Sequence, residues 1–342
     1  MLGVAGAVIW QSDGEGGLAP RATEASIPEM RIMEQAGRWE QTGRVLYADR
    51  NRTVQFTAKD EIYWALGGRA LMIESVYDTN GSSDEELAIK THHNATGEYT
   101  QTLFTDKGHV VGFRGEWDSL ERAMTWQPYF PTNNVPQMTV VLREMLLAPG
   151  QKRMRSQYRH FAMTVKDVRM ESRRTGDGIG SITPKSGSPA SEELARLGQA
   201  GDWLEQQKFK QGDKMLKTLI HGQARWAQGG RCLVFEGEVR ESDIDKPGTP
   251  LLWVKTYDQA MGAYCYAYFW ENGGVDHYVG SWNPAKKTLS WRSIKTAGGE
   301  DMTHTLEETI EQPGLRRWKY QAREFGKIVA EGEGISHLQQ VE

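Results

Sequence analysis

The segment GEWDSLERAMTW, residues 115–126, has a counterpart in GSWNPAKKTLSW, residues 280–291. Both segments carry glycine first and tryptophan at the third and twelfth positions, and they lie 165 positions apart. The polar middle of each segment predicts a turn between two strands. Two tryptophans at one spacing, found twice, indicate that this part of the chain is repeated.

The repeat extends in both directions from these segments. WALGGR at 64–69 matches WAQGGR at 226–231, and QAGRW at 35–39 matches QAGDW at 199–203. Downstream, eight positions recur 164 residues later: Met138, Leu142, Pro149-Gly150, Arg153, Gln157, Arg159 and Phe161 match Met302, Leu306, Pro313-Gly314, Arg317, Gln321, Arg323 and Phe325. A period of this length indicates a tandem duplication of a complete domain, because solenoid and propeller repeats are about 20 to 50 residues long.

Composition restricts the class of protein. A chain of 342 residues accommodates two domains that can fold without a metal or a disulfide. The net charge of −4 argues against a nucleic-acid partner, for which a basic domain is expected. The two cysteines, Cys232 and Cys265, are predicted to be free and buried, since they lie on strands too far apart for a disulfide. No apolar run approaches the roughly 18 residues of a transmembrane helix.

Domain boundaries follow from the repeat. We expect a flexible or signal-like N-terminus over 1–25, a first barrel over 27–172, a linker over 173–187 and a second barrel over 188–338. Residues 2–10 are apolar, as in a secretory signal, but no basic residue precedes them, so a loosely docked terminus is the alternative. The signal-like interpretation predicts a secreted or periplasmic protein, and a cytoplasmic one is the other possibility.

Each repeat begins with a short predicted helix followed by strands. Ser26-Ile-Pro-Glu29 has the pattern of a capping box, and Ser188-Pro189 introduces the second helix, with glycines 37 and 201 ending the two helices. The remaining sequence consists of runs of about five to ten residues rich in β-branched and aromatic types. No long amphipathic helix separates these runs, which favours an all-β, antiparallel fold.

The order of these motifs resembles the bacterial calycin-like domains of unknown function, which are small lipocalin-like barrels. The resemblance covers residues 27–172 and 188–338, and it implies two tandem antiparallel barrels of eight or so strands, each after a short helix. The family's Tyr-Asp element stands at Tyr257-Asp258, whereas the first repeat has His92-His93 there. A barrel of this size holds side chains or one small ligand.

The polar residues of one repeated segment are candidates for ligand binding: Arg69 and Glu74, and Arg231 and Glu236. Residues five positions apart point to opposite faces of a strand, so only one of each pair is expected inside a barrel. A buried charge is costly unless it is paired or binds a ligand. A structural ion pair is the alternative interpretation.

Further candidates are Arg159 and Arg323, which suit a carboxylate ligand or a solvated face, and the aromatic residues Tyr257 and Tyr266, which suit an apolar ligand or a core. No metal site is predicted. The doublet His92-His93 leaves haem as a minor possibility, because adjacent strand residues face opposite ways.

No recognisable catalytic motif is present. The leading hypothesis is therefore a non-enzymatic protein that binds a small apolar or amphipathic molecule in one or both barrels. The alternatives are an interaction or scaffold module with side-chain-filled barrels, and an enzyme that uses a glutamate or histidine of a barrel interior. Oligomeric state does not follow from the sequence.

Overall fold

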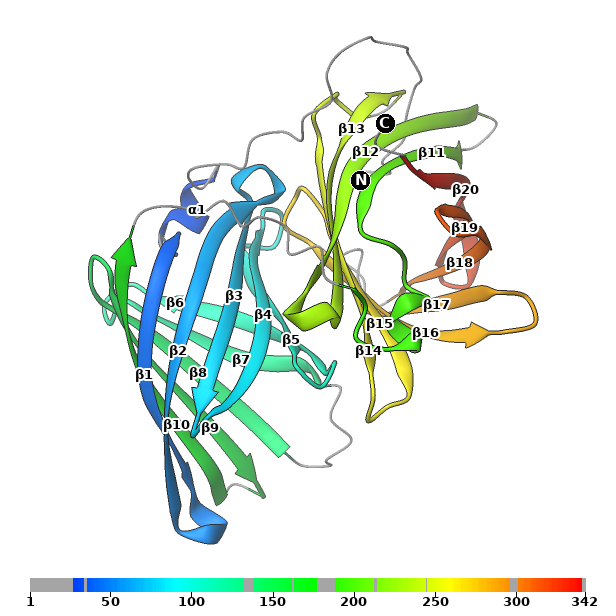
Figure 1. Ribbon diagram of the computed structural model, residues 1–342. Coiled ribbons are helices and arrows are strands. Elements are labelled where there is room, and N and C mark those ends of the chain that lie inside the picture. The colour runs from blue at the N-terminus through cyan, green and yellow to red at the C-terminus, as the bar shows by residue number, and fades with distance from the viewer. Residues whose placement is uncertain are drawn as a thin grey trace. The chain divides into compact units, whose positions relative to one another are not determined.

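The computed structural model describes residues 27–33, 36–131, 138–161, 163–176, 188–211, 214–243, 245–295 and 301–339. The chain divides into two compact units, and each is a closed antiparallel barrel (Figure 1). The predicted all-β fold is confirmed. Each barrel has ten strands, so the expected number of eight or so was too low.

The first barrel contains α1 (Pro28–Arg31) and strands that pair in chain order, with β1 and β10 closing the circle. The strands are β1 (Gly37–Tyr47), β2 (Arg52–Ala65), β3 (Ala70–Thr79), β4 (Ser82–His93), β5 (Glu98–Thr105), β6 (Val110–Asp118), β7 (Ala123–Pro131), β8 (Met138–Ala148), β9 (Gln151–His160) and β10 (Met163–Gly176). In Figure 1 the blue β1 and the green β10 run side by side.

The second barrel contains α2 (Glu192–Ala195) and has the same topology, with β11 paired to both β12 and β20. Its strands are β11 (Gly201–Gln211), β12 (Lys214–Ala227), β13 (Cys232–Ser242), β14 (Pro250–Asp258), β15 (Ala263–Phe269), β16 (Val275–Asn283), β17 (Thr288–Lys295), β18 (Met302–Gln312), β19 (Leu315–Glu324) and β20 (Lys327–Leu338).

The repeated Gly-x-Trp segment is a β-hairpin in each barrel. Gly115 of β6 pairs with Trp126 of β7, and Gly280 of β16 pairs with Trp291 of β17. A Cβ atom at Gly115 would lie 2.6 Å from the Trp126 ring, and one at Gly280 would lie 2.5 Å from the Trp291 ring. Glycine is required there because a fully buried indole lies against its backbone.

The repeated Gly-Gly-Arg segment is a tight turn and not part of a strand. It forms the one-turn 3₁₀ helices η2 (Leu66–Gly68) and η3 (Gln228–Gly230). In both turns all three residues have a positive φ, which glycine adopts without strain. The arginine that follows each turn precedes the next strand.

Short helices close one end of each barrel. Met30 and Met33, in and just after α1, are buried against Trp39 and Trp126 of the first barrel. Leu194 of α2 and Leu197 just after it enter the core of the second barrel. Both helices are much shorter than the segments predicted up to the glycines at 37 and 201.

The helix caps differ from the predicted ones. Ser26 lies outside the described residues, and Ile27 occupies the N-cap of α1 without a side-chain hydrogen bond. In α2 the cap is Ser191, whose hydroxyl accepts a hydrogen bond from the backbone N–H of Leu194. Pro28 does lie in the first helical turn, as the sequence indicated.

The cysteines are free and buried, as predicted. Cys232 and Cys265 both face Thr256 in the register, which places them on strands that flank β14. Among the described residues, no helix has the length and apolar character needed to cross a membrane.

Candidate functional site

Each barrel has a closed half near its helix and an open half at the other end. In the closed half of the first barrel the inward-facing side chains of Trp39, Ile62, Leu71 and Trp126 are all buried. In its open half, inward-facing residues retain partial exposure: Val45, Tyr47, Leu103, Val111, Val140, Tyr158 and Val168. The closed half is therefore a packed floor, and the open half is the part of the interior that is accessible.

A buried ion triad crosses the floor of the first barrel. The Glu144 carboxylate on β8 lies 2.6 Å from Lys90 Nζ on β4 and 3.3 Å from Lys152 Nζ on β9. Burial alone would raise the pKa of Glu144, but the two lysines outweigh it and hold that pKa below its usual value. Burial lowers the pKa of Lys90, an effect that the Glu144 carboxylate opposes.

The second barrel repeats this triad at the corresponding positions. Glu308 on β18 pairs with Lys255 on β14, and its other oxygen lies 3.4 Å from Arg316 Nη1 on β19. Lys255 and Arg316 lower the pKa of Glu308 in spite of its burial. Arg316 also donates a 2.8 Å hydrogen bond to the carbonyl of Arg196, just after α2, which ties the triad to the closing helix.

Aromatic rings enclose both triads. Lys90 Nζ lies 5.4 Å from the centroid of Trp126, and Lys152 Nζ lies 5.0 Å from that of Trp39. In the second barrel, Lys255 Nζ lies 5.6 Å from Trp291 and 4.9 Å from Tyr266. Cation–π attraction is stronger in such water-excluded surroundings, so the rings help to stabilise the buried cations.

A second carboxyl group accompanies each triad, but from a different strand. In the first barrel it is Asp60 of β2, to which Gln41 of β1 donates a hydrogen bond. In the second barrel it is Glu205 of β11, which accepts hydrogen bonds from Gln207 and from Ser336. Burial raises the pKa of Asp60 and of Glu205. With this second acid ionised, each floor carries two cations and two carboxylates and is electrically neutral.

The open half of the first barrel combines mainly aliphatic walls, which also include Phe56 and Tyr47, with a small group of titratable side chains. Burial raises the pKa of Glu86 to about 7, and the hydrogen bond from Tyr77 opposes that rise. Lys166 Nζ lies 4.6 Å from the Tyr158 ring centroid on the facing strands β9 and β10. The polar groups of this half therefore gather on β3, β4, β9 and β10.

The open half of the second barrel is aromatic and has a different polar cluster. His304 Nδ1 lies 3.1 Å from Asp276 Oδ2 and 3.2 Å from the Tyr278 hydroxyl oxygen. Rings surround this cluster: Tyr266 stacks on Tyr278 at 5.0 Å, Phe235 stacks on Trp253 at 5.0 Å, and Phe209 lies near Trp318 and Tyr320. This arrangement offers flat surfaces together with hydrogen-bonding groups.

Neither cluster is present in the other barrel. At the register positions of Asp276, Tyr278 and His304, the first barrel has Val111, Phe113 and Val140. At those of Glu86, Tyr158 and Lys166, the second barrel has Leu251, Ala322 and Ala330. The floors of the barrels correspond, whereas their accessible halves present different chemistry.

A small recess lies beside the triad in the first barrel. Its lining includes Met33, Trp117, Trp126, Glu144 and Leu146, and it has room for about one water molecule. A recess of this size leaves no space for an organic ligand at the floor. Any such ligand would have to occupy the open half.

The residues predicted from the sequence lie mainly on outer faces. Glu74 points outward from β3 and accepts a 2.8 Å hydrogen bond from Tyr63, and Glu236 lies 3.9 Å from Arg225. Arg69 and Arg231 follow the tight turns and precede β3 and β13. The structure does not bring these four residues into a barrel interior.

The other predicted residues divide between the two faces. Arg159 and Arg323 lie on outer faces and donate hydrogen bonds to Gln157 and Gln321. Tyr257 and Tyr266 point into the second barrel, where both pack with its core. The histidine doublet is split, since His92 is buried against Tyr99 and His93 bonds Thr96. Among the described residues no cluster of metal-binding side chains occurs.

The ion triads were missed because their members are distant in the sequence. Lys90 and Glu144 are 54 residues apart, and Lys255 and Glu308 are 53 apart. A signal did exist in the repeat: Lys90 matches Lys255 and Glu144 matches Glu308 at the offsets already seen for the tryptophans. Charged residues at equal positions of two apolar strands indicate a shared interior site.

Comparison with known proteins adds little to this description. No protein-family model and no curated protein matches the sequence. Among solved structures, the chain is similar to a DUF3598-family protein of unknown function from Nostoc punctiforme, with a TM-score of 0.30, 8% identity and coverage of 92% of this chain and 100% of that one.

Two further solved structures show comparable similarity. Kievitone hydratase from Nectria haematococca matches with a TM-score of 0.18, 8% identity and coverage of 95% and 94% of the two chains. Transferrin Binding Protein B from Haemophilus parasuis matches with a TM-score of 0.22 and 7% identity, and the match covers 90% of this chain and 77% of that one. At these scores the neighbours carry no argument about function, which is drawn from the side chains.

Proposed function

We propose that this chain is a non-enzymatic binding protein whose barrels each take a small apolar or amphipathic molecule into the open half. The observation that carries the proposal is the contrast in exposure along each interior. In the first barrel most inward-facing side chains are buried at the floor and partly exposed beyond it. In the second barrel Asp276, Tyr278 and His304 are buried, and the partly exposed inward-facing residues around them are Phe209, Leu251, Trp253, Tyr268 and Trp318. A barrel used only as a rigid scaffold has no need of an accessible half.

The chemistry of the two open halves supports two different ligands. The aliphatic residues of the first barrel suit the flexible chain of an amphipathic molecule, and Lys166, beside Glu86, suits an anionic head group. The aromatic walls of the second barrel suit a planar aromatic molecule, because rings prefer offset or edge contacts with other rings. Asp276, Tyr278 and His304 supply donors and acceptors for its hydroxyl groups.

A residue exchange between the barrels tests this assignment. The triple variant Asp276→Val, Tyr278→Phe and His304→Val gives the second barrel the residues of the first at these positions. The probes are naphthol, a planar aromatic alcohol for the second barrel, and dodecanoate, a flexible amphipathic chain for the first. We expect the triple variant to bind naphthol about 10-fold or more weakly, since the site loses its hydrogen-bonding groups. Dodecanoate binding to the first barrel is expected to stay unchanged. Tryptophan fluorescence titrations with both probes measure the two affinities.

The control is the reciprocal exchange Glu86→Leu, which copies Leu251 and leaves the second barrel intact. Because Glu86, when ionised, has the same charge as the dodecanoate head group, this variant is expected to bind dodecanoate more tightly and to leave naphthol binding as it was. If neither probe binds the unaltered protein at any accessible concentration, the binding function is wrong and the scaffold interpretation gains. If the triple variant loses affinity for naphthol and for dodecanoate equally, the open halves of the two barrels are not separate sites.

The repeat and its location complete the proposal. Triads and hairpins at matching offsets support an origin by tandem duplication. The linker was predicted over 173–187, and residues 173–176 of that range belong to β10. Bacterial origin, membership of the calycin-like family and export stay predictions from the sequence. N-terminal sequencing of the protein from its host tests export: an intact Met1 in a cytosolic fraction would refute it.

A further inference from the structure

A row of four arginines crosses the outer face of the first barrel. Arg143 of β8 faces Arg155 of β9, Arg155 faces Arg169 of β10, and Arg169 faces Arg44 of β1. With strands about 4.8 Å apart, the row is about 14 Å long at the backbone. Like charges directly opposite one another destabilise a sheet, and carboxylates offset this only in part: Glu121 pairs with Arg143, while Asp167 is shared by Arg155 and Arg169.

The second barrel has a paired ladder at the same positions. There Glu307 faces Lys319, Lys319 faces Glu333, and Glu333 faces Lys208. Alternating signs are the arrangement that stabilises neighbouring strands. The fold therefore does not require arginine at these positions, and the row is particular to the first barrel.

The excess of positive charge extends over the whole face formed by β8, β9, β10 and β1, here called the arginine face. Eight arginines point outward on it against three carboxylates, an excess of five positive charges: Arg38, Arg44, Arg143, Arg153, Arg155, Arg159, Arg169 and Arg173 against Glu40, Asp167 and Glu171. The matching face of the second barrel carries five of each sign: Lys208, Lys210, Arg317, Lys319 and Arg323 against Asp202, Glu307, Glu311, Glu331 and Glu333.

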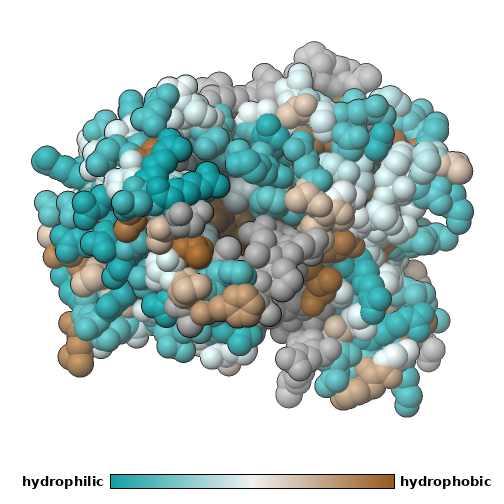
Figure 2. Space-filling view, turned by 90° about the horizontal axis from the view of Figure 1, so that it is seen from below, coloured by the Kyte–Doolittle hydropathy of each residue, from teal (hydrophilic) through white to brown (hydrophobic). Residues whose placement is uncertain are grey.

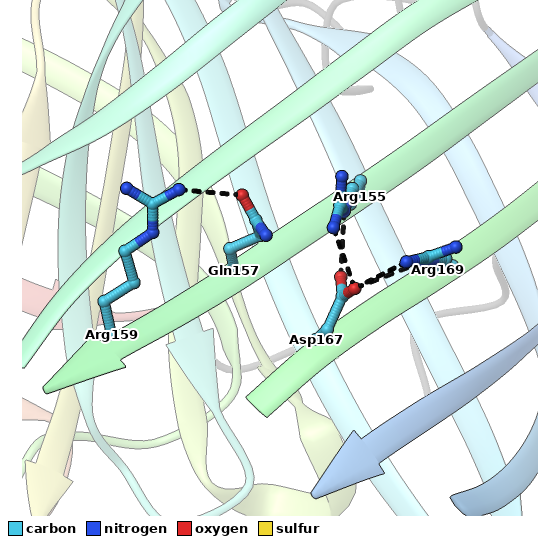
Figure 3. A network of polar contacts seen from close by, with 5 residues as sticks. All are labelled: Arg155, Gln157, Arg159, Asp167 and Arg169. Carbon is cyan, nitrogen blue, oxygen red and sulfur yellow. Dashed lines mark hydrogen bonds and ion pairs between the residues drawn. The ribbon is translucent and has the colours of Figure 1, made fainter. Parts of the chain in front are cut away.

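The centre of the arginine face is held in place by one acid. Asp167 lies beneath Arg155 and Arg169, with Nη2 to Oδ2 distances of 2.9 and 3.0 Å (Figure 3). The two arginine side chains remain about half exposed, while the aspartate is 7% exposed. Each guanidinium has five N–H donors, so both keep donors free for an external anion. Among the described residues no carboxylate pairs with Arg44 at the end of the row.

Apolar side chains lie on the same strands toward the open end. Leu46 faces Asp167 in the register and is 39% exposed. Phe161 and Met163, at the turn between β9 and β10, are 63% and 67% exposed. On the face seen from below in Figure 2, apolar residues form separate brown patches on a mainly hydrophilic surface. A cationic belt beside exposed apolar residues is the arrangement of peripheral membrane-binding surfaces.

We propose that the arginine face docks the first barrel on a membrane surface containing anionic phospholipids, with Phe161 and Met163 entering the interfacial layer. Arginine binds phosphate groups through paired donors, and headgroup phosphates supply the negative charge that the face lacks. The tip residues border the open half, so docking places its entrance at the lipid. The proposal concerns the outer face and does not depend on which ligand the barrels hold.

Vesicle co-sedimentation tests the proposal on the full chain. The protein is expected to bind phosphatidylcholine vesicles that contain phosphatidylglycerol and not to bind vesicles of pure phosphatidylcholine. Added salt is expected to dissociate it, because the Debye length falls from about 10 Å at 0.1 M to about 3 Å at 1 M. The double variant Arg44→Gln and Arg143→Gln removes two charges of the row. Its partition constant is expected to fall by about 30-fold.

Matched controls come from the second barrel. Lys208→Gln with Lys319→Gln removes the same charge from the corresponding row, and vesicle binding is expected to stay unchanged. Phe161→Asn is expected to weaken vesicle binding, whereas Phe325→Asn is not; both phenylalanines have a positive φ, which asparagine tolerates. Circular dichroism of each variant confirms that it is folded.

Three outcomes would overturn the proposal. One is no binding to anionic vesicles. Another is a fall in vesicle binding by the Lys208→Gln and Lys319→Gln variant equal to that of the Arg44→Gln and Arg143→Gln variant, which would show that net charge alone is responsible. The third is binding of inorganic polyphosphate that depends on Arg44 and Arg143 but not on Phe161, without vesicle binding, which would assign the face to a soluble polyanion.

Discussion

In the first barrel Glu144 lies between Lys90 and Lys152, and in the second Glu308 lies between Lys255 and Arg316. Beyond these equal floors the interiors differ, since one is aliphatic with Glu86 and the other is aromatic with His304 and Asp276. Shared residues mark what a barrel of this kind needs in order to close. Residues that differ mark what each barrel presents to other molecules.

The outer faces support the same distinction. An alternating ladder in the second barrel and a row of arginines in the first occupy equal positions of equal strands. The ladder contributes to the stability of its own sheet. The row lacks this alternation, since Glu121 and Asp167 pair with only part of its charge, and the remaining charge suits an external anion.

The largest effect is expected from breaking the shared triad. Glu144→Gln or Glu308→Gln leaves two buried cations without their carboxylate, and each is expected to cost about 3 to 5 kcal/mol of unfolding free energy. Urea denaturation measures both. The comparison predicts similar costs in the two barrels, because the triads have the same architecture.

A control removes the first triad together with the acid that balances its charge. Lys90→Met, Glu144→Leu, Lys152→Met and Asp60→Asn together are expected to leave stability nearly unchanged or higher, since neutral residues of similar volume replace all four ionisable groups. A cost above that of Glu144→Gln alone would show that the triad does more than fill the floor.

An effect of roughly 3 kcal/mol is expected from Glu86, which only the first barrel has. Its pKa rises from the usual 4.5 to about 7 on folding. Between these values the unfolded chain loses its proton while the folded chain keeps it, so this contribution to stability is complete below pH 4.5 and is lost as pH rises through 7.

The variant Glu86→Leu copies Leu251 and removes this titration. It is expected to be less sensitive to pH between 4.5 and 7 than the unaltered protein, and more stable above pH 7. Denaturation midpoints across this range measure the difference. If the denaturation midpoint of the variant changes with pH as steeply as that of the unaltered protein, Glu86 ionises in the folded barrel as it does in water.

The smallest effect, up to about 1 kcal/mol, is expected on the outer faces and with opposite signs. Arg44→Glu places an acid opposite Arg169 and is expected to stabilise the first barrel. Lys208→Glu places an acid opposite Glu333 and is expected to destabilise the second. Thermal unfolding at low and high salt measures both shifts, which salt should reduce. Shifts of the same sign would contradict the difference drawn between the row and the ladder.

The fold followed from the sequence because its signals are local. The Gly-x-Trp hairpins, the helix before each barrel and the strand-like runs each depend on residues within about a dozen positions. The Gly-Gly turn was not predicted, since apolar neighbours on both sides hide a turn of only three residues. The number of strands was underestimated because strands such as β9 and β10 have few apolar residues to mark them.

The site was harder to predict because it depends on which side chains face inward and meet across the barrel. Glu74 and Glu236 stand out in apolar sequence, yet the register turns them outward. Asp276 and His304 lie on β16 and β18, separated by β17, and no spacing rule joins them. Tyr266 was identified because alternation along one strand is visible in the sequence.

Native mass spectrometry of the freshly purified chain tests the central claim most directly. If the open halves are binding sites, the intact protein carries one or two additional small masses that are lost on denaturation, or acquires them from dodecanoate and naphthol. A spectrum showing only the unliganded chain, before and after exposure to both compounds, would contradict the account and leave the barrels as structural modules.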